Sequence, residues 1–470
     1  MPCRILTDCL YEIFEFLEKD KLTLHSCLLV NRTWCKISVR ILWRDVLSFK
    51  YASYQSEVSS QILNTLISCL PNESKELLHK NEIFISTPTT KSPLFNYVLF
   101  CKFLSIHEID HLIQHNLENQ QIITSRNLNF SKYLILQEVL KMFMKQIPSL
   151  KELKYSREHI MNVTFTHFPG AKKCLTDLAV LSCSSDIHSE FFNQLSQICC
   201  NIQSLNIEFK GFVSSELKGL ISSQYGLKDL SLIQSYDGTA DWTEIIPSLT
   251  KHIKTLIKLK IYGGKNHVPL LFINTFKNLQ QLVLKVYENS FEELNKLNYD
   301  KFSRLEILKF QYLHPNSNIL IKFLENNGKN LKEFHIGNSY NNSLNLAIAK
   351  FCPNLKSLRT EFIDDEIETL KMIFYNCQKL EKIRIGCSRE MLDIVAKYSP
   401  KNFHKLKSYV LYDFELNSVD LELFFINWKN RKQQKSLTFK LNCIYSTEVV
   451  KKEIMDIIEK YKNLGIIKVY

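Results

Sequence analysis

Residues 352–360 read Cys-Pro-Asn-Leu-Lys-Ser-Leu-Arg-Thr, and residues 377–385 read Cys-Gln-Lys-Leu-Glu-Lys-Ile-Arg-Ile. Both stretches contain the pattern L-x-x-L-x-L or a close variant of it. The same pattern recurs along most of the chain with a mean period of about 26 residues, which is typical of units that stack into a solenoid. Its copies begin at Leu150, Leu175, Ile202, Leu227, Leu256, Leu279, Leu305, Leu331, Leu355, Leu380, Leu406, Gln434 and Leu464.

Between copies of the pattern, apolar residues recur with the period of a helix. Leu344, Ile348 and Phe351 follow one copy, and Ile367 and Phe374 lie at the same helical spacing after the next. A strand and a helix in each unit, stacked on their neighbours, predict an α/β solenoid with parallel strands on its concave side and helices on its convex side. The pattern resembles leucine-rich repeats, which implies a horseshoe of about 13 repeats over residues 148–470.

Cysteines occupy one position of this repeat, three residues before the first leucine, at Cys199, Cys352 and Cys377. This placement resembles the cysteine-containing class of leucine-rich repeats. We interpret these thiols as small buried residues where the helix returns to the strand, rather than as metal or redox groups. The asparagine expected at the ninth repeat position is absent, and only Cys183 lies there.

The first 48 residues do not follow the repeat and instead predict three short helices, at residues 7–17, 22–30 and 31–43. Asp20 is a candidate N-cap for the second of these helices, and Thr7 for the first. An i, i+4, i+7 stripe of Leu10, Phe14 and Leu17 predicts one buried face on the first helix.

The same residues resemble the F-box family. Residues 6–17 read Leu-Thr-Asp-Cys-Leu-Tyr-Glu-Ile-Phe-Glu-Phe-Leu, which is similar to the F-box opening L-P-x-E-I-L-x-x-I-F-x-x-L, with Thr7 in place of proline and Asp8 in place of glutamate. Residues 27–34 continue the match with Cys-Leu-Leu-Val-Asn-Arg-Thr-Trp, and residues 41–43 with Ile-Leu-Trp.

The resemblance implies that the module docks on a Skp-type adaptor, and through it on a cullin scaffold, as part of an SCF ubiquitin ligase. The shared core and docking face would be formed by Leu6, Thr7, Leu10, Ile13, Phe14, Leu28, Leu29, Val30, Trp34 and Trp43. The alternative is that these residues are only the core of a helical cap on the solenoid. A module this short cannot bury much surface alone, so its apolar faces must meet a partner or the repeats.

Residues 49–147 are expected to form a helical linker and N-terminal cap with degenerate repeats. One helix ends at Pro71 and another at Pro148, and residues 100–104 are a candidate strand of a degenerate first repeat.

Alternate residues of each repeat strand are expected to face solvent. The position after the second leucine reads Lys154, Ala179, Asn206, Ser231, Lys260, Val283, Lys309, His335, Arg359, Arg384 and Val410. Neighbouring positions add Lys258, Lys285 and Lys382. One hypothesis is that the basic members of this stripe bind an acidic or phosphorylated protein substrate, with the arginines making bidentate contacts. The alternative is a solvated lysine-rich face.

Composition narrows the class of protein further. The 470 residues are 45% hydrophobic with a net charge of +12, and no apolar run is long enough for a membrane span. The 14 cysteines form no C-x-x-C pair, so we expect reduced thiols and a cytoplasmic or nuclear location. Nucleotide, zinc-protease and serine-hydrolase motifs are absent, so we expect a non-catalytic chain without cofactors or bound metal.

The sequence thus predicts a substrate receptor of a ubiquitin ligase, monomeric within its complex and not bound to a membrane or to nucleic acid. The alternative is an interaction scaffold, for nucleic acid or an acidic partner, whose F-box-like segment no longer recruits a ligase. Binding of the adaptor would support the first, and salt-dependent binding of nucleic acid the second.

Overall fold

The structure is a computed structural model that describes residues 7–48, 56–83, 93–119, 125–156, 163–235, 239–263, 270–285, 302–311, 314–337, 339, 341–362, 366–386, 388–410, 416–431, 436–443 and 447–469. The chain divides into two compact units. The first comprises Met1–Leu227 and Thr239–Leu249, and the second comprises Lys228–Gly238 and Thr250–Tyr470.

The first unit begins with three helices, α1 (Thr7–Glu15), α2 (Lys21–Cys27) and α3 (Arg32–Leu42). They match the three predicted helices but end one to three residues earlier. Asp20 caps α2 as predicted, because its side chain accepts from the Thr23 amide at 3.1 Å, and the Asn31 side chain accepts from the Trp34 amide at 2.9 Å to cap α3. Thr7 is the first helical residue, and its side chain is outside the described part of the structure.

A small hydrophobic core holds these helices together. Its buried members are Leu10, Phe14, Leu24, Cys27, Ile37, Ile41 and Leu42. The Phe14 and Trp34 rings meet edge to face with centroids 5.1 Å apart. We refer to residues 7–48 as the N-terminal module.

Helices continue after the module, interrupted by one short strand. Their bounds are η1 (Val46–Ser48), α4 (Ser56–Ser68), α5 (Asn72–Lys80), η2 (Tyr97–Phe100), β1 (Phe103–Ser105), α6 (Ile106–Asn119) and α7 (Ser125–Gln146). α4 ends before Pro71 and α7 before Pro148, since proline cannot continue a helix.

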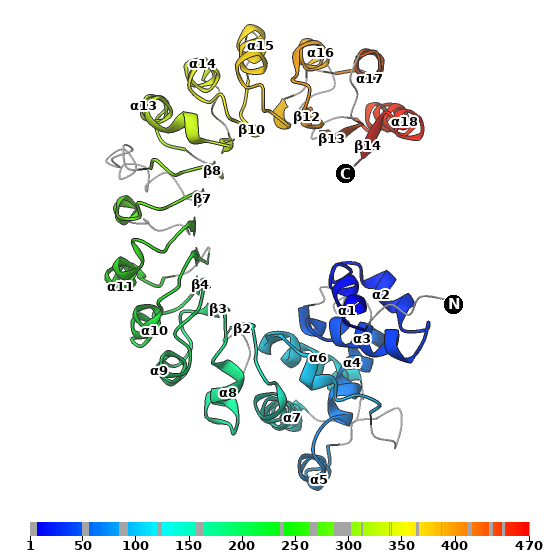
Figure 1. Cartoon of the computed structure of the whole chain (residues 1–470), viewed down its shortest axis with the longest axis vertical. Helices are drawn as coiled ribbons and strands as arrows, with labels where there is room; N and C mark the ends of the chain where they lie inside the picture. Colours follow the sequence, from blue (N-terminus) through cyan, green and yellow to red (C-terminus); the bar gives the residue numbers. More distant parts are fainter. Residues whose placement is uncertain are drawn as a thin grey trace. The chain divides into compact units, whose positions relative to one another are not determined.

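The rest of the first unit alternates strands and helices. Its elements are β2 (Glu152–Tyr155), η3 (Phe165–His167), α8 (Ala171–Leu175), β3 (Val180–Ser184), α9 (Ser189–Ile198), β4 (Ser204–Phe209), α10 (Leu217–Ser223), η4 (Thr243–Ile245) and α11 (Ile246–Leu249). β1 to β4 pair in chain order, each parallel to the next. Within this unit, α8, α9 and α10 lie on one side of the strands (Figure 1).

The second unit repeats the same arrangement. Its elements are β5 (Asp229–Gln234), η5 (Thr250–His252), β6 (Lys258–Tyr262), η6 (Leu271–Thr275), β7 (Gln281–Lys285), β8 (Ile307–Phe310), α13 (Ser317–Asn327), η9 (Gly328–Asn330), β9 (Glu333–His335), α14 (Asn342–Phe351), β10 (Ser357–Arg359), α15 (Ile367–Asn376), β11 (Lys382–Gly386), α16 (Arg389–Tyr398), β12 (Lys405–Val410), α17 (Ser418–Lys429), β13 (Leu437–Cys443), α18 (Glu448–Asn463) and β14 (Ile467–Val469). Each of these strands is parallel to the next. In Figure 1, α13 to α18 line the side of the sheet opposite its open face.

The core lies between the strands and the helices. The repeat leucines Leu259, Leu331, Leu355 and Leu380 are fully buried. Parallel strands joined through helices, with the repeat leucines packed between the two layers, are the leucine-rich-repeat fold that the sequence predicted.

The structure corrects the register of four repeats, the last of which begins at Ile466 rather than Leu464 because Phe439 pairs with Val469. Leu153 pairs with Leu181, so the second copy begins at Leu178 rather than Leu175. Ile383 pairs with Leu406, which therefore holds the second position of its repeat rather than the first. Leu406 in turn pairs with Phe439, two residues after the predicted position; Gln434, the predicted start of that repeat, is outside the described residues.

These corrections change the solvent-facing column. Ala179 leaves it and Ser182 takes its place, since Lys154 pairs with Ser182. Val410 also leaves it, because Arg384 pairs with Lys407. Cys183, predicted at the ninth repeat position, is a buried residue of β3 instead.

An asparagine ladder does exist, but one position before the first leucine. The Nδ2 atoms of Asn278, Asn330 and Asn354 donate to the carbonyls of Lys254, Ser303 and Lys329 in the preceding repeat, at 2.7, 2.8 and 2.9 Å. The cysteines Cys199, Cys352 and Cys377 are fully buried, as expected, and burial raises the pKa of Cys199 and of Cys377 to about 12. These thiols therefore stay protonated and serve packing.

Candidate functional site

The N-terminal module exposes large apolar side chains that its own core does not cover. Phe16 and Leu29 are each 89% exposed and Leu22 is 83% exposed, and Ile13 and Val30 are about half exposed. We call these five residues the apolar face. Ile13 lies on α1 and Leu22 on α2, while Phe16 lies in the turn that follows α1, and Leu29 and Val30 lie in the turn that follows α2.

The predicted adaptor-binding residues divide into three groups. Leu10 and Phe14 are buried in the module core, and Leu28, Trp34 and Trp43 pack against that core. Ile13, Leu29 and Val30 point outward. Leu6 and the Thr7 side chain are outside the described residues.

Sequence reasoning missed Phe16 and Leu22. Phe16 lies off the predicted stripe of Leu10, Phe14 and Leu17, so an apolar residue on the other side of the predicted helix was the signal for it. Leu22 lies in the first turn of α2, two residues after the N-cap Asp20. Nothing in that position indicated that its side chain would be exposed.

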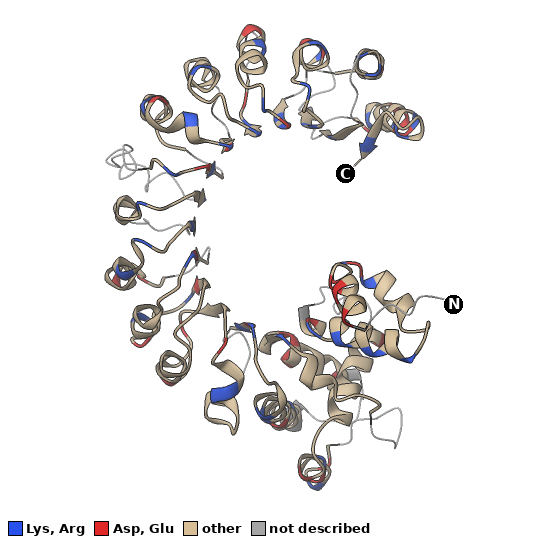
Figure 2. Ribbon diagram, viewed as in Figure 1, with Lys and Arg blue, Asp and Glu red and all other residues tan. Residues whose placement is uncertain are grey.

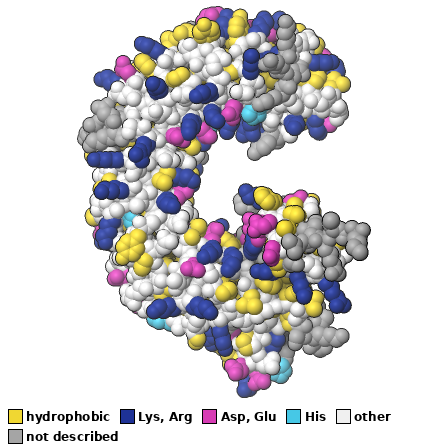
Figure 3. All heavy atoms as spheres, in the orientation of Figure 1, with side chains coloured by type: hydrophobic (Ala, Val, Ile, Leu, Met, Phe, Trp, Pro, Cys, Tyr) yellow, Lys and Arg dark blue, Asp and Glu magenta, His cyan; other side chains and the backbone are white. Residues whose placement is uncertain are grey.

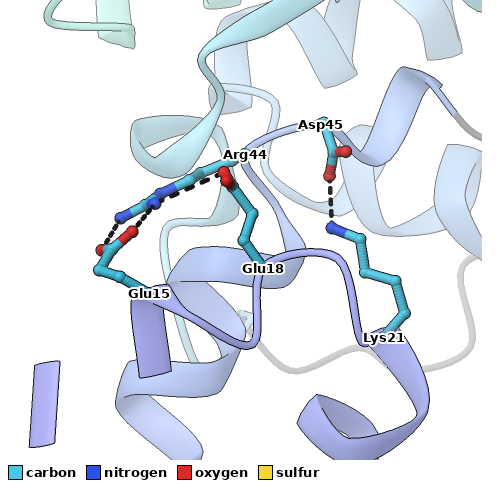
Figure 4. Close-up of polar contacts among 5 residues, drawn as sticks. All are labelled: Glu15, Glu18, Lys21, Arg44 and Asp45. Atoms are coloured by element: carbon cyan, nitrogen blue, oxygen red, sulfur yellow. Dashed lines mark hydrogen bonds and ion pairs between the residues drawn. The ribbon is translucent and has the colours of Figure 1, made fainter. Parts of the chain in front are cut away.

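Ion pairs fix the helices of the module to the segment after α3 (Figure 4). The Arg44 guanidinium donates to both carboxylate oxygens of Glu15 and lies 3.7 Å from Glu18, while Lys21 Nζ lies 2.8 Å from an oxygen of Asp45. The hydrogen bond from Arg44 lowers the pKa of Glu15 below its usual value. These side chains keep considerable contact with solvent, so the pairs orient the helices more than they stabilise them.

The main chain of Arg44 joins the module to the first strand. Its carbonyl accepts from the amides of Lys102 and Phe103, at 2.9 and 3.0 Å. The carbonyl of Lys102 accepts in the same way from Lys151 and Glu152, at the start of β2. Arg44 therefore holds the position of a repeat, directly before β1. The Trp43 ring adds a contact with Tyr97, with centroids 4.4 Å apart.

The second candidate surface is the open face of the sheet in the second unit (Figures 2 and 3). Many of its predicted binding residues have acidic or aromatic neighbours. Lys258 and Lys260 lie 4.0 and 3.9 Å from Asp229. Lys285 lies over the Tyr262 ring at 5.9 Å.

On β8 and β9 the pairing is tighter. Lys309 lies 2.7 Å from Glu333, and Lys382 lies 3.9 Å from the same carboxylate. His335 Nε2 lies 3.0 Å from the Ser357 hydroxyl, and burial, with Lys309 nearby, lowers its pKa to about 4. His335 is therefore neutral near pH 7 and adds no positive charge.

The predicted arginines lie beyond this paired stretch. Arg359 and Arg384 occupy paired positions on β10 and β11, and the corrected register places Lys407 and Lys440 next to them on β12 and β13. Lys382 and Lys405 lie two residues earlier on β11 and β12, also paired. We call these six residues the basic cluster. Lys405, Lys407 and Lys440 were missed because the predicted register ended the column at Val410.

No helix in the described part of the chain is both long and apolar enough to cross a membrane. The described residues also contain no group of three or more histidine, cysteine or acidic side chains placed to hold a metal ion.

The chain has a leucine-rich-repeat fold, with a helical module at its N-terminal end. No family model matches it, and no curated protein does. Among solved structures, it is similar to the yeast Rad7–Elc1 complex at 12% identity and a TM-score of 0.37, over 93% of this chain and 98% of that chain.

Two bacterial leucine-rich-repeat proteins are also similar. LegL7 of Legionella pneumophila is 14% identical, with a TM-score of 0.36, over 63% of this chain and 96% of that one. LIC12759 of Leptospira interrogans is 14% identical, with a TM-score of 0.30, over 71% of this chain and 91% of that one. Likenesses of this strength support no functional argument.

Proposed function

We propose that this protein is a substrate-recognition subunit of an SCF-type cullin ubiquitin ligase. The N-terminal module docks on a Skp-type adaptor, and the open face of the repeats binds the protein to be ubiquitinated. The observation that carries the proposal is the apolar face, which lies on a three-helix module whose sequence resembles the F-box.

The size of the apolar face supports a partner. Burying a large apolar side chain contributes about 1.5–3 kcal/mol, so covering Phe16, Leu22 and Leu29 alone would contribute several kcal/mol to binding. Single exposed apolar residues are ordinary on protein surfaces, whereas five on one small module indicate an interaction surface.

In this role the protein is a non-catalytic receptor in the cytoplasm or nucleus. Its contribution to the reaction is proximity, because it holds the target beside the ubiquitin-charged enzyme that the cullin recruits. Leu10 and Phe14 act by holding the module together, and the apolar face makes the contact with the adaptor. A lost ligase role would leave an interaction scaffold, which the following experiment separates from the receptor.

The test is a pull-down of purified Skp-type adaptor by the full chain and by a Phe16→Asp/Leu29→Asp variant. We expect the variant to retain less than about a tenth of the binding, since both side chains would lie in the buried centre of the interface. The matched control is Val419→Asp/Val449→Asp, which changes two exposed apolar residues on α17 and α18.

Thermal unfolding of each variant checks that it folds, because all four positions are exposed. Adaptor binding that is absent in the unaltered chain would overturn the receptor proposal in favour of the scaffold. Equal loss in both variants would show that the apolar face is not the contact.

A further inference from the structure

We propose that a pocket in the second unit, at the edge of the sheet where β8 to β11 begin, binds a small anion that carries several phosphate groups. We call it the edge pocket. Its charged lining residues precede the strands, so none of them belongs to the basic cluster; they are Arg304, Glu306, Lys329, Lys332, Lys356 and Lys379. The inference goes beyond the proposed function, because neither the adaptor nor the target is needed for this site.

The lining of the edge pocket is polar and mostly positive. Among the described lining residues five are cations and one, Glu306, is a carboxylate, while the others are amides and a serine. No aliphatic or aromatic side chain is among them. The pocket has a volume of about 530 Å³, a size that fits a small molecule. A ligand there is therefore held by charge and hydrogen bonds rather than by burial of apolar surface.

Two of the five cations already have a carboxylate beside them. Lys332 Nζ lies 2.7 Å from an oxygen of Glu306, and Lys356 Nζ lies 3.4 Å from an oxygen of Glu381. These side chains are partly exposed, so each pair is weak and leaves its lysine able to contact a more highly charged anion.

The other three cations have no carboxylate partner. In the described part of the structure, the charged nitrogens of Arg304 and Lys329 have no carboxylate oxygen within 4.0 Å and no hydrogen-bond acceptor, and both residues are exposed. Lys379 Nζ donates to Oδ1 of Asn354 at 2.7 Å, and a neutral amide oxygen leaves its charge in place. A guanidinium can bind two oxygens of one phosphate, and lysines add point charges beside it.

The main chain that carries these cations is fixed from one repeat to the next. Asn330 Nδ2 donates to the Ser303 carbonyl at 2.8 Å, and Asn354 Nδ2 donates to the Lys329 carbonyl at 2.9 Å. The amide of Lys332 donates to the Glu306 carbonyl at 2.7 Å. Because the loops are held before a ligand arrives, less conformational entropy is lost on binding.

The same edge has a different charge in the first unit. There Asp177 occupies the position before the first repeat leucine, which Arg304 occupies before β8. The Ser149 hydroxyl donates to Asp177 at 2.7 Å, and Lys151 Nζ lies 3.3 Å from the same carboxylate. Excess positive charge is thus a property of the edge pocket and not of the repeat edge in general.

The spacing of the cations favours several phosphate groups over one. Arg304 precedes β8, Lys329 precedes β9 and Lys379 precedes β11. Neighbouring strands lie about 4.8 Å apart, so β8 and β11 are separated by about 14 Å. A single phosphate is too small to contact side chains from all of these repeats, whereas a chain of phosphates between them can do so.

The experiment measures binding to the full chain by isothermal titration calorimetry at a fixed, near-physiological salt concentration. The probe is inorganic tripolyphosphate, with inorganic phosphate as the single-group comparison. Hexaglutamate, which carries at least as much negative charge, represents an acidic protein segment. We expect a Kd for tripolyphosphate below about 0.1 mM, and binding of the other two probes weaker by at least about tenfold.

The variant Arg304→Ala/Lys329→Ala should lose at least about tenfold in affinity for tripolyphosphate. The matched control is Lys254→Ala/Lys277→Ala, which removes two exposed lysines that precede β6 and β7 and do not line the pocket. Both variants lower the net charge by the same amount, and the control should stay within about twofold of the unaltered chain. Thermal unfolding checks that both variants fold, since all four side chains are exposed.

Equal loss in the two variants would overturn the proposal, because it would mean that the anion responds to net charge alone. A Kd above about 0.1 mM for the unaltered chain would also overturn it. Equal affinity for inorganic phosphate would contradict recognition of several groups, and equal or tighter binding of hexaglutamate would assign the pocket to an acidic protein segment instead.

Discussion

The strands β6 to β9 and the strands β10 to β13 both carry basic residues on the open face of the sheet, yet they differ in charge balance. On β6 to β9, Asp229 and Glu333 lie close to Lys258, Lys260 and Lys309. On β10 to β13, cations face cations. The difference shows that basic residues alone do not make an anion site, because a cation that already has a carboxylate beside it is less available to a ligand. What locates it is where the fold leaves positive charge without a nearby carboxylate.

His335 lies on β9, at the boundary between the two stretches. The largest predicted effect is the dependence of folding stability on the protonation of this residue. Its pKa of about 4 in the folded state lies below the ordinary value of 6.5, so the unfolded chain binds the proton first as pH falls. The contribution of neutral His335 to stability is thus complete above about pH 6.5 and is lost as pH falls towards 4.

We expect this loss to be about 2 kcal/mol, allowing for the part of the ring that solvent reaches. The measurement is urea unfolding of the unaltered chain and of His335→Gln at several pH values. Glutamine retains a group that can bond to Ser357 but does not titrate, so the variant should show a flatter pH dependence. An unchanged slope would mean that His335 is not the titrating group.

The difference in charge balance between the two stretches can be reduced by placing a carboxylate on β13, as Asp229 provides one on β5. Thr438 pairs with Lys405 and faces the same side as the basic cluster. If the open face binds an acidic or phosphorylated target, Thr438→Glu should weaken binding of a fluorescent phosphoserine peptide, measured by anisotropy, by about tenfold, because the new carboxylate competes with phosphate for the lysines. Thr438→Gln, of nearly equal size, is the control and should change the affinity little.

The difference in charge balance can be increased by removing the carboxylate of Glu333 at the edge of the basic cluster. Glu333→Gln releases Lys382 and Lys309 from their shared carboxylate. We expect the affinity for the same phosphoserine peptide to rise by about threefold, with a loss of stability below about 1 kcal/mol, since partly exposed pairs contribute little. Lower affinity in this variant would indicate that Glu333 orients Lys382 for binding rather than competing with the ligand.

The fold was predictable because buried leucines at fixed spacing are the physical requirement of a stacked repeat. The predicted register is wrong where apolar residues fit the repeat spacing in two alternative ways. Leu175, Leu178 and Leu181 are three residues apart, so two registers fit equally well until the neighbouring strands choose between them. At β12 the first position is Phe403, an aromatic residue that is fully buried where a leucine was expected.

The candidate sites were predictable only in part for the same reason. The shift on β12 hid Lys405 and Lys407, although Arg359 and Arg384 were identified. In the N-terminal module, matching a motif selected residues such as Leu10 and Phe14 that are buried. Exposure of Phe16 depends on where the other helices lie, which no periodicity within one helix determines.

The joint at Arg44 has a consequence for where the module can be. If residues 45–101 were a flexible tether, the module would wander over about 40 Å relative to β1. Two main-chain hydrogen bonds to Lys102 and Phe103 instead fix its position within the first unit. The contact of Tyr97 with the Trp43 ring adds to this hold on the module. A partner bound to the apolar face is therefore held at one geometry relative to β1, and less positional entropy is lost than a flexible tether would cost.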